Sequence, residues 1–322
     1  MASSSLPCGS SQSGEIPLNY LNPAEIHVNN VIGTGSFGRV HVGRIRGNPT
    51  PVAIKVIFEK RGRSYERLHR NMLREAQMLM HLEGHANIVK LIGVVDWPMM
   101  LVFELCPQGS LGTLLQKSGE TIGTEMRIQL AVQAARSLEW VHMKGVIHRD
   151  LASRNCLVSD GVLKLCDFGI SCSAANPRIN INSPLNVRWT APEVWSQETV
   201  SFATDVYAFA ILLWEMFAIP PTKPYASYSG EQVRRMTIDG VRLGVPPAMP
   251  PSVVALMKSC WDGNPALRPT ASAARCELER ILMNNEFDPK SCQRVYEKLN
   301  EAEQRKTEMR DGRPEPPAKK TR

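Results

Sequence analysis

Two acids and an amide stand close together near the middle of the 322-residue chain. Asp150 and Asn155 belong to the segment His-Arg-Asp-Leu-Ala-Ser-Arg-Asn at 148–155, and Asp167 opens an Asp-Phe-Gly segment twelve residues after Asn155. Carboxylate and amide oxygens are the ligands that Mg²⁺ takes in proteins, usually together with the phosphates of a substrate. The spacing therefore points to chemistry with a hard cation and a phosphate, although one such cluster alone is also compatible with a polar loop.

A glycine-rich turn and a lysine earlier in the chain suit the same chemistry. Residues 33–40 read Gly-Thr-Gly-Ser-Phe-Gly-Arg-Val, and the next residues indicate a strand, whereas a dinucleotide-binding turn needs a helix there. Glycines at the tip of a hairpin let backbone N–H groups approach phosphates closely, and the alternative is an ordinary glycine turn. Lys55 lies in the apolar run Val52–Ile57. Its burial is costly unless Glu75 pairs with it, the alternative being an edge-strand lysine in solvent.

The elements that must position these residues change in type along the chain. Residues 26–105 are strand-like, and one helix is predicted between 66 and 82, where apolar residues recur at helical spacing. Residues 87–95 and 100–105 are expected to be short strands. After Ser110 the pattern is helical, and the predicted helices are 124–143, 204–217, 230–239, 251–260 and 270–283. The sequence thus predicts an α+β protein, a small strand-rich lobe followed by a larger helical lobe.

Taken together, these motifs resemble those of the protein kinase family over about residues 26–284. Ala191-Pro192-Glu193 is similar to the family's Ala-Pro-Glu motif. Asp205 is similar to the aspartate that braces the catalytic loop, and Arg268 to the arginine that pairs with Glu193. The resemblance implies a bilobed kinase fold. Its parts would be a Ser/Gly-rich leader at 1–25, an N-lobe at about 26–105, a C-lobe at about 107–284 and a polar, basic tail at 285–322.

The resemblance also implies an enzyme that uses ATP and Mg²⁺ and phosphorylates a protein substrate. Lys55 would hold the ATP phosphates and pair with Glu75. Asp150 would accept or orient the proton of the substrate hydroxyl, with Arg154 as the cation near the γ-phosphate. Asn155 and Asp167 would bind Mg²⁺. The residues expected around ATP are Ile32, Gly33, Gly35, Gly38, Val40, Ala53, Lys55, Phe103, Glu104, Cys106 and Leu157.

The residues that follow Asp150 favour tyrosine as the phosphate acceptor. Many serine/threonine kinases carry a lysine two residues after this aspartate, whereas this chain has Ala152 there and Arg154 two residues later, as tyrosine kinases do. Two departures put substrate choice in doubt: Ser153 replaces the usual second alanine, and Asn186 replaces a proline that shapes the platform for the substrate ring. The alternatives are a serine/threonine or dual-specificity tyrosine-kinase-like enzyme, and a non-catalytic kinase-fold scaffold.

The segment between the Asp-Phe-Gly and Ala-Pro-Glu motifs, residues 170–190, contains no tyrosine. Tyrosine autophosphorylation of this segment is therefore excluded. We expect the segment to be active unmodified, or to be switched by phosphorylation of Ser183 with Arg149 as the partner of the phosphate. Thr190 is expected to contact Asp150 as a structural residue and not as a phosphate acceptor.

Charge and composition limit the class of protein further. Lys plus Arg number 38 and Asp plus Glu number 31, and the whole excess of +7 falls in residues 59–74 and 302–322. These two basic patches suit acidic partners, the alternative being solvated faces without a partner, and no nucleic-acid binding is expected. The eight cysteines show no metal-site spacing, the first residues do not resemble a secretory signal, and no apolar stretch is long enough to cross a membrane. We expect a cytoplasmic protein, with the tail as a candidate nuclear-targeting segment.

Overall fold

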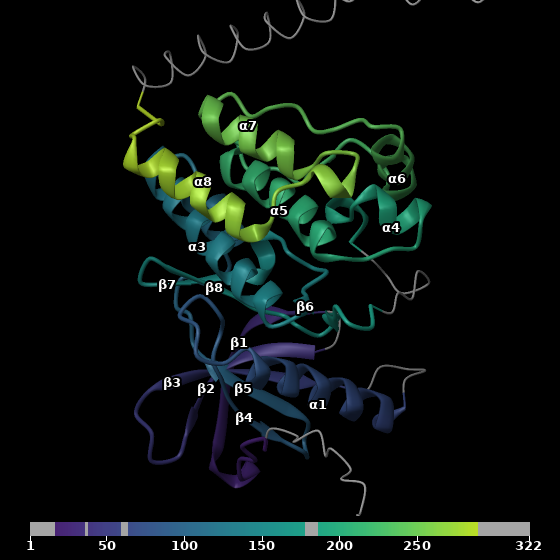
Figure 1. The fold of residues 1–322 in the computed structure, drawn as a ribbon. Helices are drawn as coiled ribbons and strands as arrows, with labels where there is room; N and C mark the ends of the chain where they lie inside the picture. The colour runs from purple at the N-terminus through teal and green to yellow at the C-terminus, as the bar shows by residue number, and fades with distance from the viewer. Residues whose placement is uncertain (1–16, 36–37, 59–63, 178–185, 289–322) are drawn as a thin grey trace, which may run out of the picture. The chain divides into compact units, whose positions relative to one another are not determined.

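A computed structural model describes residues 17–35, 38–58, 64–177 and 186–288 of the chain. The described residues divide into two compact units (Figure 1). One unit holds the residues up to Glu83 together with Lys90–Leu105, and the other holds Gly84–Val89 and the residues from Cys106 onward. Ser183, the 302–322 basic patch, part of the 59–74 patch and most of the leader lie outside the described residues.

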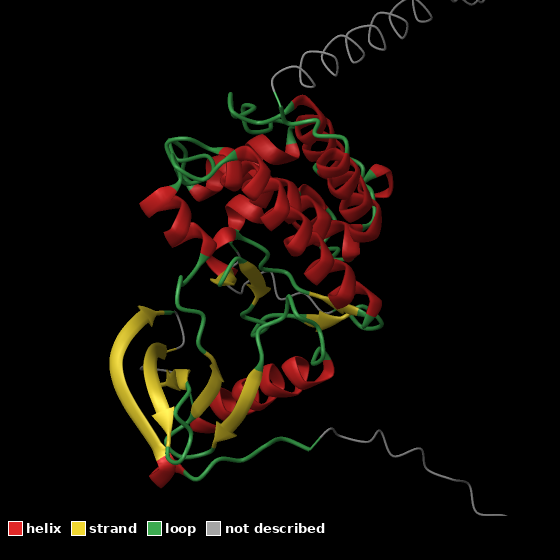
Figure 2. Cartoon of the chain, turned by 90° about the vertical axis from the view of Figure 1, so that its left-hand side faces the viewer, coloured by secondary structure: helices red, strands yellow, loops and turns green. Residues whose placement is uncertain are grey.

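The first unit is built on an antiparallel sheet, whose strands are yellow in Figure 2. The sheet has five strands in the order β1-β2-β3-β5-β4. Its strands are β1 (Ile26–Thr34), β2 (Gly38–Ile45), β3 (Pro51–Ile57), β4 (Leu91–Val95) and β5 (Met100–Glu104). Val52 and Ile54 are buried in an apolar cluster on one face of this sheet. Because successive side chains of a strand point to opposite faces, Ala53 and Lys55 project from the other face.

Helix α1 (Tyr65–His81) follows the sheet's first three strands and confirms the helix predicted between 66 and 82. Ser64 caps it, since its hydroxyl accepts the backbone N–H of Arg67. The residues that α1 buries are Leu68, Met72, Glu75, Ala76 and Leu79. Glu75 is thus a carboxylate on an otherwise apolar helix face, and its burial requires a cationic or hydrogen-bonding partner.

The second unit is mainly helical (Figure 1). Its helices are α2 (Leu111–Ser118), α3 (Thr124–Met143), α4 (Pro192–Ser196), α5 (Phe202–Phe217), α6 (Gly230–Ile238), α7 (Pro251–Cys260) and α8 (Ala271–Met283). All five helices predicted after Ser110 are present. The sequence analysis missed α2 and α4, which span only eight and five residues and are too short to show a clear helical period. The predicted α+β organisation, with a small strand-rich part and a larger helical part, is confirmed.

Helix α5 is the buried centre of the helical unit. It begins with a capping box between Ser201 and Thr204, and it is buried along nearly its whole length. Helices α3 and α7 both pack against it. A helix that is apolar on all sides belongs in the interior. Asp205 and Glu215, the two acids on α5, therefore have to find donors inside the protein.

Two pairs of short strands lie in the segment between α3 and α4. Strand β6 (Val146–Ile147) pairs with β9 (Cys172–Ser173), and β7 (Cys156–Ser159) pairs with β8 (Val162–Leu165). Asp160 and Gly161 turn the β7–β8 hairpin with positive φ angles of 50° and 77°, as a two-residue hairpin turn requires. This hairpin places the residue before β7 beside the residues that follow β8.

The stretch 87–95, predicted as one strand, is divided between the two units. Only Leu91–Val95 is a strand of the sheet. The backbone N–H of Val89 donates to the carbonyl of Leu165 at 3.0 Å, and the side chain of Asn87 donates to the carbonyl of Leu163 at 2.8 Å. These bonds to β8 attach residues 84–89 to the helical unit. None of the helices in the described residues has the length and apolar character needed to cross a lipid bilayer.

Candidate active site

The strand-rich unit brings Lys55 and Glu75 together. The Lys55 Nζ donates to both carboxylate oxygens of Glu75, at 2.7 and 2.9 Å. Strand β3 presents the lysine from the face opposite the apolar cluster, and α1 presents the glutamate with only 6% of its surface exposed. Loss of either partner would leave a charge poorly solvated, so the pair also holds α1 against β3. A primary ammonium group held in this way can bind a phosphate as a point charge.

The turn between β1 and β2 carries the predicted glycines. Gly33 lies opposite Val40 in the strand register, and the backbone N–H of Gly35 donates to the carbonyl of Gly38 at 2.9 Å. A Cβ atom added to Gly38 would lie 2.0 Å from the carbonyl oxygen of Val56, so any side chain there would displace β3. Residues 36 and 37 lie outside the described residues.

Several predicted apolar side chains share the face of the sheet that carries Lys55. Val40 lies directly opposite Lys55 on β2, and Phe103 lies directly opposite Ala53 on β5. Directly opposed residues of neighbouring strands point to the same face. Ile32, on β1, is 53% exposed. Glu104 ends β5, and its carboxylate accepts the backbone N–H of Lys90 at 2.8 Å.

The helical unit holds Asp150 in a network of donors. Its Oδ1 accepts the side-chain amide of Asn186 at 2.6 Å and also accepts the guanidinium of Arg154. Its Oδ2 accepts the side-chain amide of Asn155 at 2.7 Å. The residue is 9% exposed. Donors on both oxygens fix the direction of the carboxylate, so a hydroxyl that approaches Asp150 meets a preoriented acceptor.

Thr190 does not make the contact with Asp150 that was expected. Its hydroxyl donates to the carbonyl of Asn186 at 3.1 Å. The 3-10 turn at Val187–Trp189 brings these two residues together, and the amide of Asn186 reaches Asp150 instead. Asn186, which stands in place of a proline, therefore makes the contact with Asp150. A proline could not make it, because proline has no side-chain donor.

The β7–β8 hairpin places Asn155 beside the start of the Asp-Phe-Gly motif. The backbone N–H of Cys166 donates to the carbonyl of Asn155 at 2.9 Å, and Asp167 is the next residue. The Nδ2 of Asn155 makes both bonds to Asp150, one to its carbonyl and one to its Oδ2, which leaves Oδ1 as the atom suited to a metal. The donors offered here are oxygens, so the residues fit a hard cation such as Mg²⁺.

The backbone of Asp167 has φ of 61°. This left-handed conformation is uncommon outside glycine, and aspartate is one of the side chains that tolerates it. Such conformations occur at functional sites when the surroundings enforce them.

Two further predicted site residues, Leu157 and Cys106, also lie in the helical unit. Leu157, on β7, is partly buried. Cys106 is 7% exposed, and its carbonyl accepts the N–H of Gly109 at 3.0 Å.

Asp205 braces the loop that carries Asp150. Its two oxygens accept the backbone N–H groups of His148 and Arg149, each at 2.8 Å, and the ring of His142 lies 3.0 Å from Oδ2. Burial by itself would raise the pKa of Asp205, but the His142 hydrogen bond, the nearby imidazoles and the Arg149 N–H hold that pKa below its ordinary value. The imidazole of His148 in turn packs edge-on against Phe168, with ring centroids 4.8 Å apart.

Glu193 and Arg268 form a buried bidentate ion pair. The two guanidinium nitrogens lie 2.7 and 2.8 Å from the two carboxylate oxygens. Arg268 also donates to the carbonyl of Ala203 at 2.8 Å. The pair therefore joins the Ala-Pro-Glu segment to the start of α5 and to the turn before α8, in the arrangement that the sequence resemblance implied.

Glu215 is a residue near this site that the sequence analysis did not single out. Its carboxylate accepts the backbone N–H of Ser153 at 3.0 Å, the hydroxyl of Ser153 at 2.7 Å and the indole N–H of Trp189 at 3.0 Å. The ring of Trp189 lies 4.3 Å from the guanidinium carbon of Arg154. The available signal was a single acid in the apolar run from Ala210 to Phe217.

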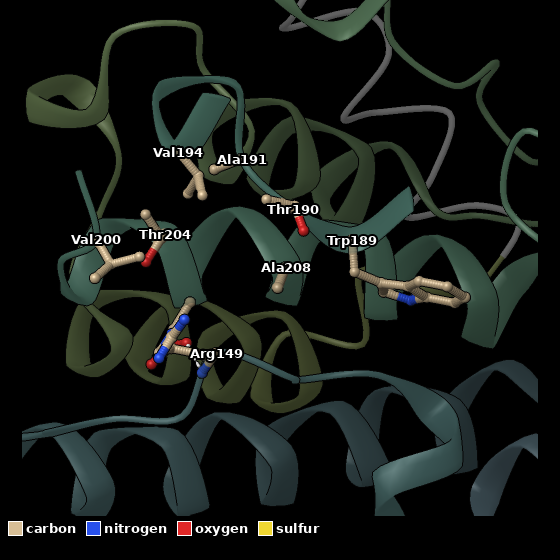
Figure 3. Close-up of a pocket in the computed structure, with 9 residues that line it drawn as sticks. Arg149, Trp189, Thr190, Ala191, Val194, Val200, Thr204 and Ala208 are labelled. Carbon is tan, nitrogen blue, oxygen red and sulfur yellow. Dashed lines mark hydrogen bonds between the residues drawn. The ribbon is translucent and has the colours of Figure 1, made fainter. Parts of the chain in front are cut away.

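A small pocket lies within the helical unit, and Trp189 is one of the residues that line it (Figure 3). Its volume is about 20 Å³, which is enough for a single water molecule. The residues that line it come from the loop of Asp150, the Ala-Pro-Glu region and α5: Arg149, Trp189, Thr190, Ala191, Val194, Val200, Thr204, Asp205 and Ala208. It is far too small for a nucleotide.

Comparison with known proteins agrees with this geometry. The family described as "Protein tyrosine and serine/threonine kinase" matches residues 26–278. The "Tyrosine-protein kinase transforming protein Fps" of avian sarcoma virus (strain PRCII) is 37% identical over 267 residues, which are 81% of this chain and 49% of that protein. Mouse "Tyrosine-protein kinase Fer" is 34% identical over 267 residues, 81% of this chain and 32% of that protein. Human "Tyrosine-protein kinase ABL2" is 32% identical over 284 residues, 86% of this chain and 23% of that protein.

The chain spans less than half the length of each of these relatives. The family match nevertheless runs from the first strand of the sheet almost to the end of α8, and it contains every residue assigned above to the site. The chain therefore belongs to the protein tyrosine and serine/threonine kinase family.

Proposed function

We propose that this protein is an ATP-dependent tyrosine kinase that transfers the γ-phosphate of ATP to the hydroxyl of a tyrosine in a protein substrate. The observation that carries the proposal is the contact between Asp150 and Arg154, four residues apart in one loop. It places a cation beside the carboxylate that would receive the substrate hydroxyl. The relatives reported above are named as tyrosine-protein kinases, in agreement with this assignment.

The residues of the strand-rich unit would bind ATP. Lys55, held by Glu75, would contact the phosphates, and the backbone N–H groups of Gly33, Gly35 and Gly38 would cover them. The adenine would lie among the apolar side chains, with Phe103 behind it and the backbone at Glu104 as a hydrogen-bonding partner. The side chains of this unit proposed to pack on the adenine are Ile32, Val40 and Ala53.

Asn155 and Asp167 would hold Mg²⁺ through their side-chain oxygens. The metal, when bound, neutralises negative charge that develops on the phosphate. Asp150 would accept the proton of the tyrosine hydroxyl. Its Oδ2, which accepts the amide of Asn155, has a second lone pair for the hydroxyl of the substrate, so the contact between Oδ1 and Arg154 can be kept. Positioning and charge cancellation are the main requirements of phosphoryl transfer, and these residues provide both.

The experiment that tests this proposal compares the purified chain with its Asp150→Asn variant, given Mg²⁺ and ATP. Three peptides differ only in having tyrosine, serine or phenylalanine at one position. We expect phosphotyrosine from the wild type, and a loss of about 10²- to 10⁴-fold in the variant because the acceptor of the proton is gone. An Asp239→Asn variant, changed at an exposed position of the same unit, is the control. Equal phosphate incorporation by the wild type and Asp150→Asn would refute the enzymatic function.

One observation supports a second possible specificity for the phosphate acceptor. Asn186 stands where a proline shapes the platform for a tyrosine ring, and its amide occupies Asp150 Oδ1 at 2.6 Å. A serine/threonine or dual-specificity enzyme is therefore the alternative, and phosphoserine as the main product of the peptide test would establish it. A non-catalytic scaffold is disfavoured, since Lys55, Asp150, Asn155 and Asp167 are all present.

The partners and location of the protein belong to the same proposal. Arg67, Arg70 and Arg74 are exposed on α1, and we propose that they meet an acidic partner. We further propose a catalytic unit over about 26–284 that acts in the cytoplasm.

Phosphorylation of Ser183 would act as a switch through Arg149. In the structure the guanidinium of Arg149 donates to the carbonyl of Ile170 at 3.1 Å. Full activity of a phosphate-free Ser183→Ala enzyme would eliminate that switch.

A further inference from the structure

Glu215 joins two segments that are far apart in the sequence. Ser153 belongs to the loop of Asp150, and Trp189 belongs to the segment before the Ala-Pro-Glu motif. The carboxylate accepts two hydrogen bonds from Ser153 and one from the indole N–H of Trp189, all between 2.7 and 3.0 Å. With three donors, two of them on Oε2, the group acts as a bridge between the two segments.

The two bridged residues both lead to Arg154. Ser153 is its neighbour in the chain, so the bond from the Ser153 N–H to Glu215 fixes the backbone from which Arg154 extends. Trp189 supports the guanidinium end of the Arg154 side chain, because the guanidinium carbon lies 4.3 Å from the centre of the Trp189 ring. Arg154 then contacts Asp150. A continuous series of contacts thus runs from α5 through Glu215, Trp189 and Arg154 to the carboxylate of Asp150.

Two of the three donors require an acceptor atom at Glu215. The N–H groups of Ser153 and of the Trp189 indole both point at Oε2 and cannot accept a hydrogen in return, whereas the hydroxyl of Ser153 can. Burial raises the pKa of Glu215 above its ordinary value, and the bonds from Ser153 and Trp189 and the charge of Arg154 offset only part of that rise. The hydroxyl of Ser153 replaces the methyl group of the alanine expected at this position, so this chain adds a donor to the bridge.

We infer that Glu215 is a positioning residue for tyrosine recognition, which fixes Trp189 against Arg154 so that the two form one wall of the site for the phenolic ring. The inference rests on the proposed tyrosine kinase function and adds to it the residue that sets the substrate wall. Glu215 itself does not touch Asp150 and is not a catalytic residue. Its loss is expected to act on the peptide substrate and to leave the binding of ATP nearly unchanged.

The test uses the full chain and its Glu215→Met, Trp189→Phe and double variants, with the tyrosine peptide and ATP varied separately. Methionine keeps the approximate length of glutamate and removes both acceptor oxygens, and phenylalanine keeps an aromatic ring while removing the indole N–H. We expect each single variant to lower kcat/KM for the peptide about 10- to 100-fold with less than a twofold change in the KM for ATP. The double variant is expected to have a kcat/KM within about threefold of that of the less active single variant, because both changes remove the hydrogen bond between Glu215 and the indole N–H of Trp189. Glu231→Met, at an exposed site on α6, is the control and is expected to match the wild type.

A spectroscopic readout covers the case in which activity changes through stability alone. The indole N–H signal of Trp189, in protein labelled with ¹⁵N-tryptophan, is identified by its disappearance in Trp189→Phe. We expect this signal to shift in Glu215→Met and to be unchanged in Glu231→Met. An unshifted indole signal, or equal losses for ATP and peptide accompanied by a lower Tm, would overturn the inference. Serine-only activity of the wild type would refute the proposed function and with it the substrate class named here. Tyrosine activity that Glu215→Met leaves intact would refute the inference alone.

Discussion

The carboxylate of Asp205 accepts the backbone N–H of Arg149 at 2.8 Å, and Arg149 takes a φ of 71° in the loop that this bond holds. A left-handed conformation is unfavourable for arginine, so the loop needs an external partner to keep it. Asp205 supplies that partner from the buried helix α5 and accepts the N–H of His148 with its second oxygen. The position of Asp150, one residue further on, therefore depends on an acid 55 residues away in the sequence.

Replacement of Asp205 by asparagine is expected to destabilise the protein. An amide has one acceptor oxygen, so it leaves the N–H of either His148 or Arg149 facing an NH₂ group inside the protein. We expect the free energy of unfolding to fall by about 2–4 kcal/mol, as measured by urea denaturation, together with a loss of activity. Asp239→Asn, at an exposed position after α6, is the control. An unchanged midpoint for Asp205→Asn would show that the brace adds no stability.

Low pH should reduce the difference in the free energy of unfolding between the wild type and Asp205→Asn. The pKa of Asp205 is lowered in the folded state despite its burial, because His142 and the Arg149 N–H stabilise its ionised form. Its contribution to stability is therefore fully present above the unfolded pKa of about 4 and is lost as the pH falls through the lower folded value. Urea denaturation of the wild type and Asp205→Asn from pH 7 to pH 3 should show two curves that converge toward low pH. A constant gap over that range would contradict the assignment.

Lys55→Met is expected to abolish phosphate transfer and to leave the fold intact. Methionine keeps much of the length of the side chain but removes the ammonium group that would bind the phosphates. We expect kcat/KM to fall about 10²- to 10³-fold, as for loss of a preoriented electrostatic contact. The Tm should fall modestly, because Glu75 remains buried without the Nζ that lies 2.7 Å from it.

The control for this variant is Lys90→Met, which changes an exposed lysine in the same unit. Its kinetics should equal those of the wild type. If Lys55→Met retained most of its kcat, Lys55 could not hold the role proposed for it. A circular dichroism spectrum equal to that of the wild type would show that the loss is not due to unfolding.

Arg268→Lys is expected to cost stability although the charge is conserved. A lysine cannot reproduce the two parallel bonds of 2.7 and 2.8 Å to Glu193 while also reaching the carbonyl of Ala203. Both side chains of the pair are at most 4% exposed, so unmet donors and acceptors there are poorly solvated. We expect a loss of about 2–4 kcal/mol in the free energy of unfolding.

Arg235→Lys is the matched control, because Arg235 pairs with Glu231 at the surface, with side chains 76% and 59% exposed. Exposed ion pairs contribute little, so this variant should lie within about 0.5 kcal/mol of the wild type. Equal losses for the two variants would mean that burial of the Glu193–Arg268 pair is not what makes it important.

The sequence by itself determined much about this protein. Long periodic segments such as 124–143 were predicted correctly because helical spacing over several turns is a strong signal, and the ordered set of short motifs sufficed to identify the family. Short elements escaped prediction: α4 spans five residues and β7 four, too few to show a period. Residues 84–89 also could not be assigned, because their attachment to the helical unit depends on hydrogen bonds to the distant strand β8.

Only the tertiary structure decided which side chains meet. Local spacing could not indicate that the amide of Asn186, rather than the hydroxyl of Thr190, reaches Asp150. It also could not indicate that Glu215 bridges Ser153 and Trp189, which are 36 residues apart. The physical reason is that periodicity and motifs report on burial and on local backbone shape. The partner of a buried polar group, in contrast, is set by the packing of segments that are distant in the chain, here around helix α5.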